Sequence, residues 1–165
     1  MPSGSRYRFR PATAADLPLL AGWLEEPHVR RWWGDPAEAL AEIEQAMASR
    51  DTSPMIVEMD GRPIGYLQSY DPHLEADHPY RDQPVGTVGI DISIGIPELV
   101  GKGHGSAILR QFAGELFARG AVRIVIDPSP DNAPAIRAYE KAGFRHLDTR
   151  TSIYGPAHFM AMDPL

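Results

Sequence analysis

Apolar and polar residues alternate along this chain in ways that predict both helices and strands. The clearest helix is expected from Gly103 to Gly120, where an apolar stripe recurs every three or four residues before the closing glycine. The dipeptide Asp60-Gly61 separates two apolar runs, 55–59 and 64–70, and predicts a β-hairpin. The remaining pattern predicts strands at 6–10, 85–94, 123–127, 145–151 and 158–162, and helices at 16–26, 36–49 and 132–142.

The predicted order is β-α-α-β-β-β-α-β-α-β-β. Helices interspersed with strands in this way predict an α/β fold with a mixed, mainly antiparallel sheet. A length of 165 residues predicts a single domain, residues 1–165. Residues 71–84 contain three prolines and mixed charge, and this segment is too long for an ordinary turn. We expect it to be a functional, lid-like loop.

Composition excludes several classes of function. With 16 Lys and Arg against 22 Asp and Glu, the net charge of −6 argues against a general binder of nucleic acid or anionic membranes. No stretch approaches the roughly 20 apolar residues of a membrane span, so a cytoplasmic protein is expected. The chain has no cysteine, which rules out disulfides and a thiol nucleophile. No two of the six histidines have metal-ligand spacing on a predicted helix, so no metal is predicted.

Three glycines, Gly101, Gly103 and Gly105, alternate just before the strongest helix. Glycines let the backbone approach a ligand, and a helix start offers unpaired N–H groups and a positive dipole end. This turn therefore predicts a pyrophosphate site, although its spacing fits neither a Walker A loop nor a Rossmann fingerprint. A flexible turn that binds nothing is the alternative.

Two aspartates stand out because each adjoins an apolar strand. Asp91 lies inside one, where an ionised carboxylate must face a cleft or find partners, unless that strand is at an exposed edge. Asp127 ends another, where it can bind a substrate ammonium or cap the Pro-rich turn that follows. Tyr139, on one face of a predicted helix, is compatible with core packing.

The glycine turn, Val100 to Ser106, resembles the acetyl-CoA pyrophosphate loop of the GNAT acetyltransferases. Residues 127–144 resemble the aminoglycoside 6′-N-acetyltransferases closely, and segments 64–70, 89–91 and 32–34 have counterparts there in the same order. The chain departs from the family pattern at two positions. Val100 stands where Gln or Arg is usual, and Tyr154 precedes Gly-Pro where an acidic residue is expected.

This resemblance implies a GNAT-like fold, with helices on both faces of the sheet and a splayed central strand pair that holds acetyl-CoA. Its pantetheine arm would pair with the strand end at residues 92–94, and the turn would hold the pyrophosphate with its N–H groups. His104 would be exposed there near phosphate. The residues implied to bind acetyl-CoA are Ile92, Ser93, Ile94, Val100, Gly101, Lys102, Gly103, His104, Gly105, Ser106, Asn132, Ala135 and Tyr139.

The resemblance further implies acetyl transfer to the 6′-amine of a cationic aminoglycoside by direct attack, in a monomer or homodimer. Asp91 would take the amine proton, and Tyr139 would protonate the leaving thiolate. Substrate contacts would come from Trp33, Gln68, Asp77, Asp91 and Asp127; Trp33 could instead be a core residue, Asp77 a solvated loop acid and Gln68 a strand-face residue. The alternatives are acylation of another amine, such as N6-hydroxylysine in siderophore assembly or a protein N-terminus, and a non-catalytic CoA-binding domain.

Overall fold

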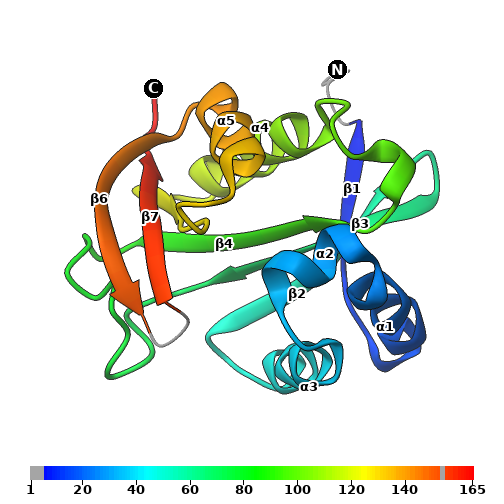
Figure 1. Ribbon diagram of the computed structural model, residues 1–165. Helices are drawn as coiled ribbons and strands as arrows, with labels where there is room; N and C mark the ends of the chain where they lie inside the picture. The colour runs from blue at the N-terminus through cyan, green and yellow to red at the C-terminus, as the bar shows by residue number, and fades with distance from the viewer. Residues whose placement is uncertain (1–5, 153–154) are drawn as a thin grey trace. The chain divides into compact units, whose positions relative to one another are not determined.

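The computed structural model describes residues 6–152 and 155–165 and contains all the predicted elements (Figure 1). Single 3₁₀ turns lie at Ala14–Asp16 and Pro97–Leu99. The helices and strands are β1 (Tyr7–Pro11), α1 (Leu17–Glu25), α2 (Pro27–Trp33), α3 (Pro36–Met47), β2 (Thr52–Met59), β3 (Arg62–Tyr70), β4 (Thr87–Ile94), α4 (His104–Ala118), β5 (Arg123–Ile126), α5 (Ala133–Ala142), β6 (Arg145–Ser152) and β7 (Gly155–Met162).

Helix α2 is absent from the predicted order, which has two helices before the hairpin where the structure has three. It has seven residues, begins at Pro27 and ends before Gly34, whose φ is +81°. So short a helix contains too few turns to show a periodic apolar stripe. Its last residues are Trp32 and Trp33, which places the tryptophan pair at a helix end.

The fold divides into two compact units, each described here by itself. The first takes the described residues up to Ser69 together with Ile92–His104, and the second takes Tyr70–Asp91 and Gly105–Leu165. Within the described residues, the hydrogen-bonded strand order is β1-β2-β3-β4-β5-β7-β6. The pairs β1–β2, β5–β7 and β6–β7 are antiparallel and β4–β5 is parallel, which confirms a mixed, mainly antiparallel sheet.

Strands β4 and β5 pair over only part of their lengths. Their parallel register runs from Thr87 opposite Arg123 to Gly89 opposite Val125, whereas β4 continues to Ile94. The ladder therefore stops midway along β4, as expected for a splayed strand pair. Asp91 lies two residues beyond the last paired position.

The first unit buries its helices against the β2–β3 hairpin. Asp60 and Gly61 both have positive φ, 53° and 77°, which matches the predicted two-residue hairpin turn. One face of each helix meets one face of the hairpin, as expected for amphipathic elements. The buried cluster consists of Leu20, Trp23 and Leu24 of α1, Val29 of α2, Ala39 and Ile43 of α3, Ile56 of β2 and Tyr66 of β3.

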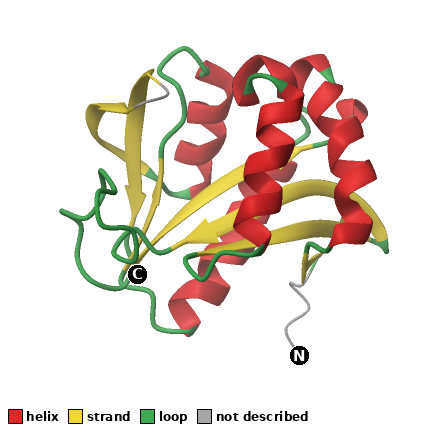
Figure 2. Ribbon diagram, turned by 90° about the horizontal axis from the view of Figure 1, so that it is seen from below, coloured by secondary structure: helices red, strands yellow, loops and turns green. Residues whose placement is uncertain are grey.

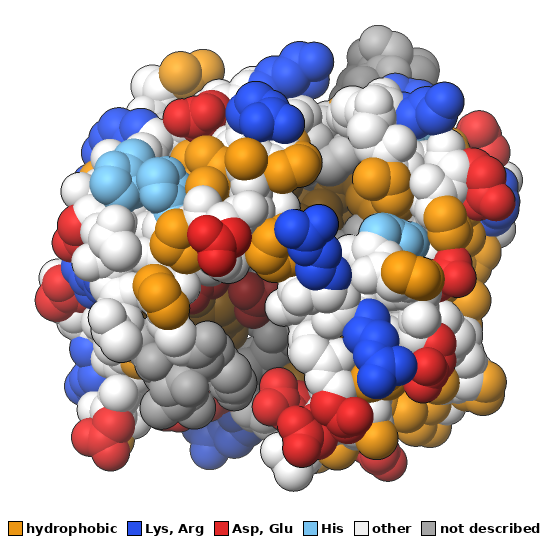
Figure 3. All heavy atoms as spheres, viewed as in Figure 1, with side chains coloured by type: hydrophobic (Ala, Val, Ile, Leu, Met, Phe, Trp, Pro, Cys, Tyr) orange, Lys and Arg blue, Asp and Glu red, His pale blue; other side chains and the backbone are white. Residues whose placement is uncertain are grey.

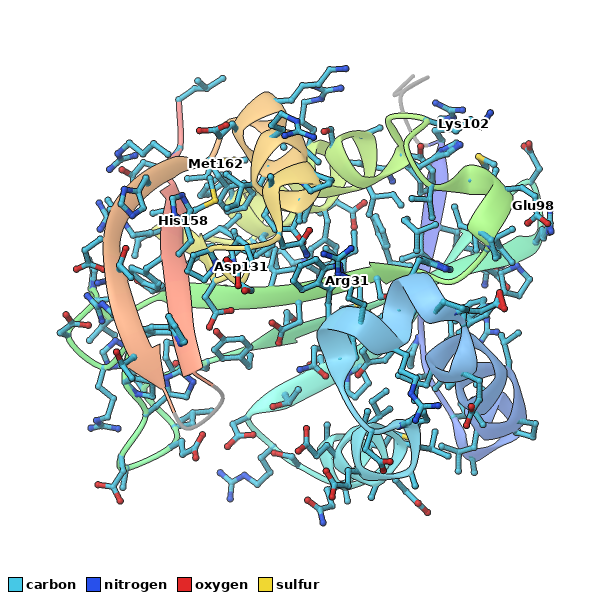
Figure 4. The ribbon with its side chains drawn as sticks, viewed as in Figure 1. Arg31, Glu98, Lys102, Asp131, His158 and Met162 are labelled. Atoms are coloured by element: carbon cyan, nitrogen blue, oxygen red, sulfur yellow. The ribbon has the colours of Figure 1, made fainter. Side chains whose placement is uncertain are left out.

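In the second unit, side chains pack on both faces of the paired strands β5 and β7. On one face, Val125, Phe159 and Ala161 pack with Tyr80 from the segment between β3 and β4, which Figure 2 draws in green as loop. On the other face, Met162 reaches Gly143 at the end of α5 (Figure 4). Helix α4 buries most of its predicted apolar stripe, namely Ile108, Leu109, Phe112, Ala113 and Leu116.

Candidate active site

The glycine turn before α4 has the backbone geometry of an anion site. Gly101 and Gly103 have φ values of +76° and +86°, which residues with a Cβ rarely adopt. Helix α4 begins directly afterwards, so its first N–H groups have no partners within the helix and its positive dipole end lies at the turn. Lys102 is exposed at the tip of the turn, as Figure 4 shows. These features fit a phosphate group.

Two side chains of the turn already make hydrogen bonds within the fold. The expectation that His104 is exposed is wrong, because it is 7% exposed and its Nδ1 lies 2.8 Å from the Tyr7 hydroxyl. Burial, and secondarily the charge of Arg6, lowers the pKa of His104 and favours a neutral ring. Ser106 is buried, and its hydroxyl donates to the Ala138 carbonyl at 2.6 Å. His104 Nδ1 and the Ser106 hydroxyl are therefore engaged within the fold, and the phosphate contacts expected of these two residues are those of their backbone N–H groups.

The second unit brings three of the predicted residues together. Asp91 of β4 and Asp127 at the end of β5 both act on Tyr139 of α5: burial, and then the charges of both aspartates, raises the pKa of Tyr139. Tyr139 therefore keeps its proton at neutral pH and can act as a proton donor.

Asp127 is a partly buried carboxylate that is bound by a tyrosine. The Tyr80 hydroxyl donates to Asp127 Oδ2 at 2.5 Å. Burial raises the pKa of Asp127, and the hydrogen bond from Tyr80 opposes this rise. Among the residues that the structure describes, no Lys or Arg forms an ion pair with Asp127. A cation from outside the chain would supply the missing counter-charge.

Tyr70 completes this group of side chains, which we call the carboxylate–tyrosine cluster: Asp91, Asp127, Tyr70, Tyr80 and Tyr139. Burial raises the pKa of Tyr70, with further contributions from the charges of both aspartates. A Cβ at Gly89 would lie 2.0 Å from the Tyr70 ring, so the ring rests directly on the β4 backbone. Glycine is needed at position 89 because no side chain fits beneath this ring.

A comparison with known protein families identifies the family of this chain. Residues 12–151 match the family described as an acetyltransferase (GNAT) domain. This chain is a GNAT acetyltransferase family member.

Relatives and solved structures agree with that assignment. The chain is 35% identical to an aminoglycoside N(6′)-acetyltransferase type 1 of Klebsiella pneumoniae, covering 96% of this chain and 83% of the relative. A structure of AAC(6′)-Ib with paromomycin and acetyl-CoA has a TM-score of 0.87 and 34% identity, covering 96% and 94% of the two chains. Another, with coenzyme A and kanamycin, has a TM-score of 0.85 and 34% identity, covering 95% and 94%. The predicted resemblance to aminoglycoside 6′-N-acetyltransferases is thereby confirmed.

Among the other acetyl-CoA residues expected of this GNAT chain, some have defined roles in the fold. Asn132 is the N-cap of α5, and its side-chain oxygen accepts from the Ala135 N–H at 3.3 Å. The Ile94 carbonyl lies 2.7 Å from His28 Nε2. The Ser93 carbonyl lies against Gly65, where a Cβ would approach to 2.7 Å. Ile92 is half-buried, and Val100 is exposed.

The remaining substrate candidates lie in three different settings. Trp33 packs edge-to-face on Tyr66, 5.8 Å between ring centroids, at the border of the first unit's core. Gln68 accepts from the Tyr66 hydroxyl at 2.6 Å. Asp77 is exposed in the loop of the second unit. The departure from the family pattern at Tyr154 lies outside the described residues.

Tyr70 and Tyr80 were not predicted as site residues. Tyr80 is the one aromatic residue in the polar segment 71–86, and an aromatic side chain in such a loop is a signal of burial. Its contact with Asp127 joins residues 47 positions apart, so no local pattern could reveal it.

His146 of β6 and His158 of β7 stack with centroids 4.0 Å apart. Figure 3 shows in pale blue the histidine side chains that reach the surface on the face it views. Across residues 6–152 and 155–165, no three His, Asp or Glu side chains gather as metal ligands would. No helix in the described part of the chain is long and apolar enough to span a membrane.

Proposed function

We propose that this GNAT chain is an acetyl-CoA-dependent N-acetyltransferase that acts on the 6′-amine of aminoglycoside antibiotics. The carboxylate–tyrosine cluster carries the proposal, since it holds a partly buried carboxylate, Asp127, for which the described residues provide no ion-pair partner. Aminoglycosides are polycations with several ammonium groups. The similarity to aminoglycoside N(6′)-acetyltransferases over nearly the whole chain supports the same substrate class.

In this proposal, each residue of the cluster has a distinct task. Asp127 binds a substrate ammonium, and Asp91 takes a proton from the 6′-amine, directly or through a water. The neutral nitrogen then attacks the thioester carbonyl, and a C–N bond replaces the C–S bond. Tyr139 gives its proton to the departing thiolate, and the second proton that the nitrogen loses on forming the amide restores the Tyr139 phenol. Transfer is direct in this proposal, and the chain has no cysteine that could form a thioester acyl-enzyme.

Acetyl-CoA is the proposed co-substrate. The N–H groups of residues 101–106 would hold its pyrophosphate, as the positive φ values of Gly101 and Gly103 and the start of α4 support. The family match spans both compact units, so we propose that the chain acts as one acetyltransferase domain.

Thiol release from acetyl-CoA in the presence of kanamycin tests the proposal. We expect release with kanamycin and none with an aminoglycoside that carries a hydroxyl in place of the 6′-amine. Mass spectrometry and NMR of the product would locate the acetyl group on the 6′-nitrogen.

Two other results would reject it. Release with a diamine or a hydroxylated lysine, but not with kanamycin, would indicate acylation of a different amine. Stabilisation of the fold by CoA, without thiol release from any amine in the panel, would indicate a non-catalytic CoA-binding domain.

A further inference from the structure

The loop between β3 and β4 presses one tyrosine into the second unit's core. Tyr80 is 2% exposed, and its ring stacks on Phe159 with centroids 4.3 Å apart. Val125 and Ala161, both fully buried, complete the apolar seat, which is the surface on which the Tyr80 ring packs. Because its ring is held on this seat, Tyr80 has little freedom to move its hydroxyl.

Arg150 of β6 clamps the loop segment that carries Tyr80. Its Nη1 donates to the Pro79 carbonyl at 3.0 Å, and its guanidinium forms two hydrogen bonds with Asp82, at 2.9 and 2.8 Å. The same guanidinium lies 4.4 Å from the centroid of the Phe159 ring and 5.5 Å from that of Tyr80. Pro79 and Asp82 flank Tyr80 in sequence, so a single side chain fixes the loop on both sides of it.

The Tyr80 hydroxyl is directed at Asp127. Burial, and then the negative charge of Asp127, raises the pKa of Tyr80 above its usual value, so the hydroxyl stays protonated and donates. Tyr70 from β3 and Tyr139 from α5 also feel the charge of Asp127, while Asp91 of β4 and Arg150 act on Tyr80. Of these groups, Tyr80 makes the hydrogen bond with the Asp127 side chain.

We propose that Tyr80 is a positioning residue that fixes the Asp127 carboxylate for binding a substrate ammonium, and that Arg150 acts through Tyr80. The proposal rests on the proposed function for the identity of the substrate. It adds two residues to the ammonium site: Tyr80 of the loop, which holds Asp127, and Arg150 of β6, which holds the loop. Because Tyr80 stabilises the charged form of Asp127, its loss raises the pKa of that carboxyl and weakens cation binding near neutral pH.

The substitution Tyr80→Phe removes the hydroxyl and keeps the ring on Phe159. We expect the pKa of Asp127, followed by carbon NMR of the side-chain carboxyl, to rise, because the carboxylate loses the hydrogen bond from Tyr80. At pH 7, KM for kanamycin should rise about 5- to 10-fold with little change in kcat or in KM for acetyl-CoA. The defect in KM should shrink as pH increases, since Asp127 ionises again.

Arg150→Lys tests the second half of the proposal. Lysine cannot make the two-pronged contact with Asp82, so KM for kanamycin should rise by a smaller factor, about 2- to 4-fold. The double variant with Tyr80→Phe should be no worse than Tyr80→Phe alone. Arg145→Lys is the matched control, because Arg145 is on the same strand and pairs with Asp163 instead. It should leave KM unchanged.

Three results would overturn the proposal: an unchanged pKa of Asp127 in Tyr80→Phe, a fall in kcat without a change in KM, or fully additive effects of Tyr80→Phe and Arg150→Lys. A wild-type protein that does not acetylate kanamycin would reject the proposed function. The NMR titration of the Asp127 carboxyl needs no enzymatic activity, so it would still show whether Tyr80 stabilises the charged form of Asp127.

Discussion

Asp16 of the first unit is buried and Asp127 of the second is half-buried, and the fold treats these two carboxylates in opposite ways. Asp16 accepts two hydrogen bonds from the Arg10 guanidinium, both at 2.9 Å, and a third from the Thr13 N–H. The bond from Arg10 is the main reason that the pKa of Asp16 is lowered. Asp127 accepts from the neutral hydroxyl of Tyr80, and burial raises its pKa.

The difference separates a structural carboxylate from a candidate binding carboxylate. The charge of Asp16 is balanced within the chain, where it also completes a capping box with Thr13 before α1. Asp127 has no such cation among the described residues, and isolated buried charge is costly in a fold. A protein that retains such a group gains from it only when a ligand supplies the opposite charge.

The largest expected effect concerns Asp91, the second aspartate of the carboxylate–tyrosine cluster. Asp91→Asn should lower kcat/KM for kanamycin on the order of 10²- to 10⁴-fold, since the amide cannot accept the amine proton. Steady-state thiol release measures it, with circular dichroism as a check of the fold. Unchanged kcat/KM would remove Asp91 from the role of base.

Tyr139 tests whether the carboxylate–tyrosine cluster supplies a proton donor to the reaction. Asp91 and Asp127 help to raise the pKa of Tyr139, so it is a protonated donor at neutral pH. Tyr139→Phe should lower kcat on the order of 10²-fold while the Kd for CoA changes little. Calorimetric titration with CoA gives the Kd. Equal losses in kcat and CoA binding would point to a packing role instead.

The contrast between Asp16 and Asp127 predicts opposite outcomes for the same substitution. Asp127→Asn should raise KM for kanamycin about 10-fold and leave the free energy of unfolding nearly unchanged. Asp16→Asn should leave KM unchanged and lower the free energy of unfolding by about 2–3 kcal/mol, since Arg10 loses its two-pronged partner and keeps only Glu58. Urea unfolding and thiol release on both variants provide the measurements. A loss of stability in Asp127→Asn as large as that in Asp16→Asn would erase the distinction.

The smallest effect is the pH dependence of stability. Asp16 has a lowered pKa in the fold, so its stabilising contribution is present above about pH 4 and is lost as pH falls further. Asp127 has a raised pKa, so its contribution to stability falls as pH increases from about 4 through its raised value.

Urea unfolding between pH 3 and 8 compares these slopes. The stability of Asp127→Asn relative to wild type should rise with pH over the window where Asp127 ionises. For Asp16→Asn, the deficit should be larger at pH 6 than at pH 3. Parallel curves for the two variants would contradict the assigned pKa directions.

Much of the fold could be predicted because its signals are local. The Asp60-Gly61 turn, the apolar stripe of α4 and the helix expected over residues 132–142 each depend on residues a few positions apart. Helix α2 was missed because its seven residues are too few for a period to emerge. His104 was expected to be exposed because its neighbours are glycines, whereas Tyr7, 97 residues away, buries it.

The sequence by itself determined the element order apart from α2, the glycine turn and the family, and it singled out Asp91, Asp127 and Tyr139. Only the tertiary structure decided that these three share one cluster, and that Tyr70 and Tyr80 join it. It also decided which carboxylate has a counter-charge within the chain, since Arg10 forms an ion pair with Asp16 while no described Lys or Arg pairs with Asp127. The physical reason is that burial and counter-charge depend on which distant segments meet, whereas propensities and motifs are carried by neighbours in sequence.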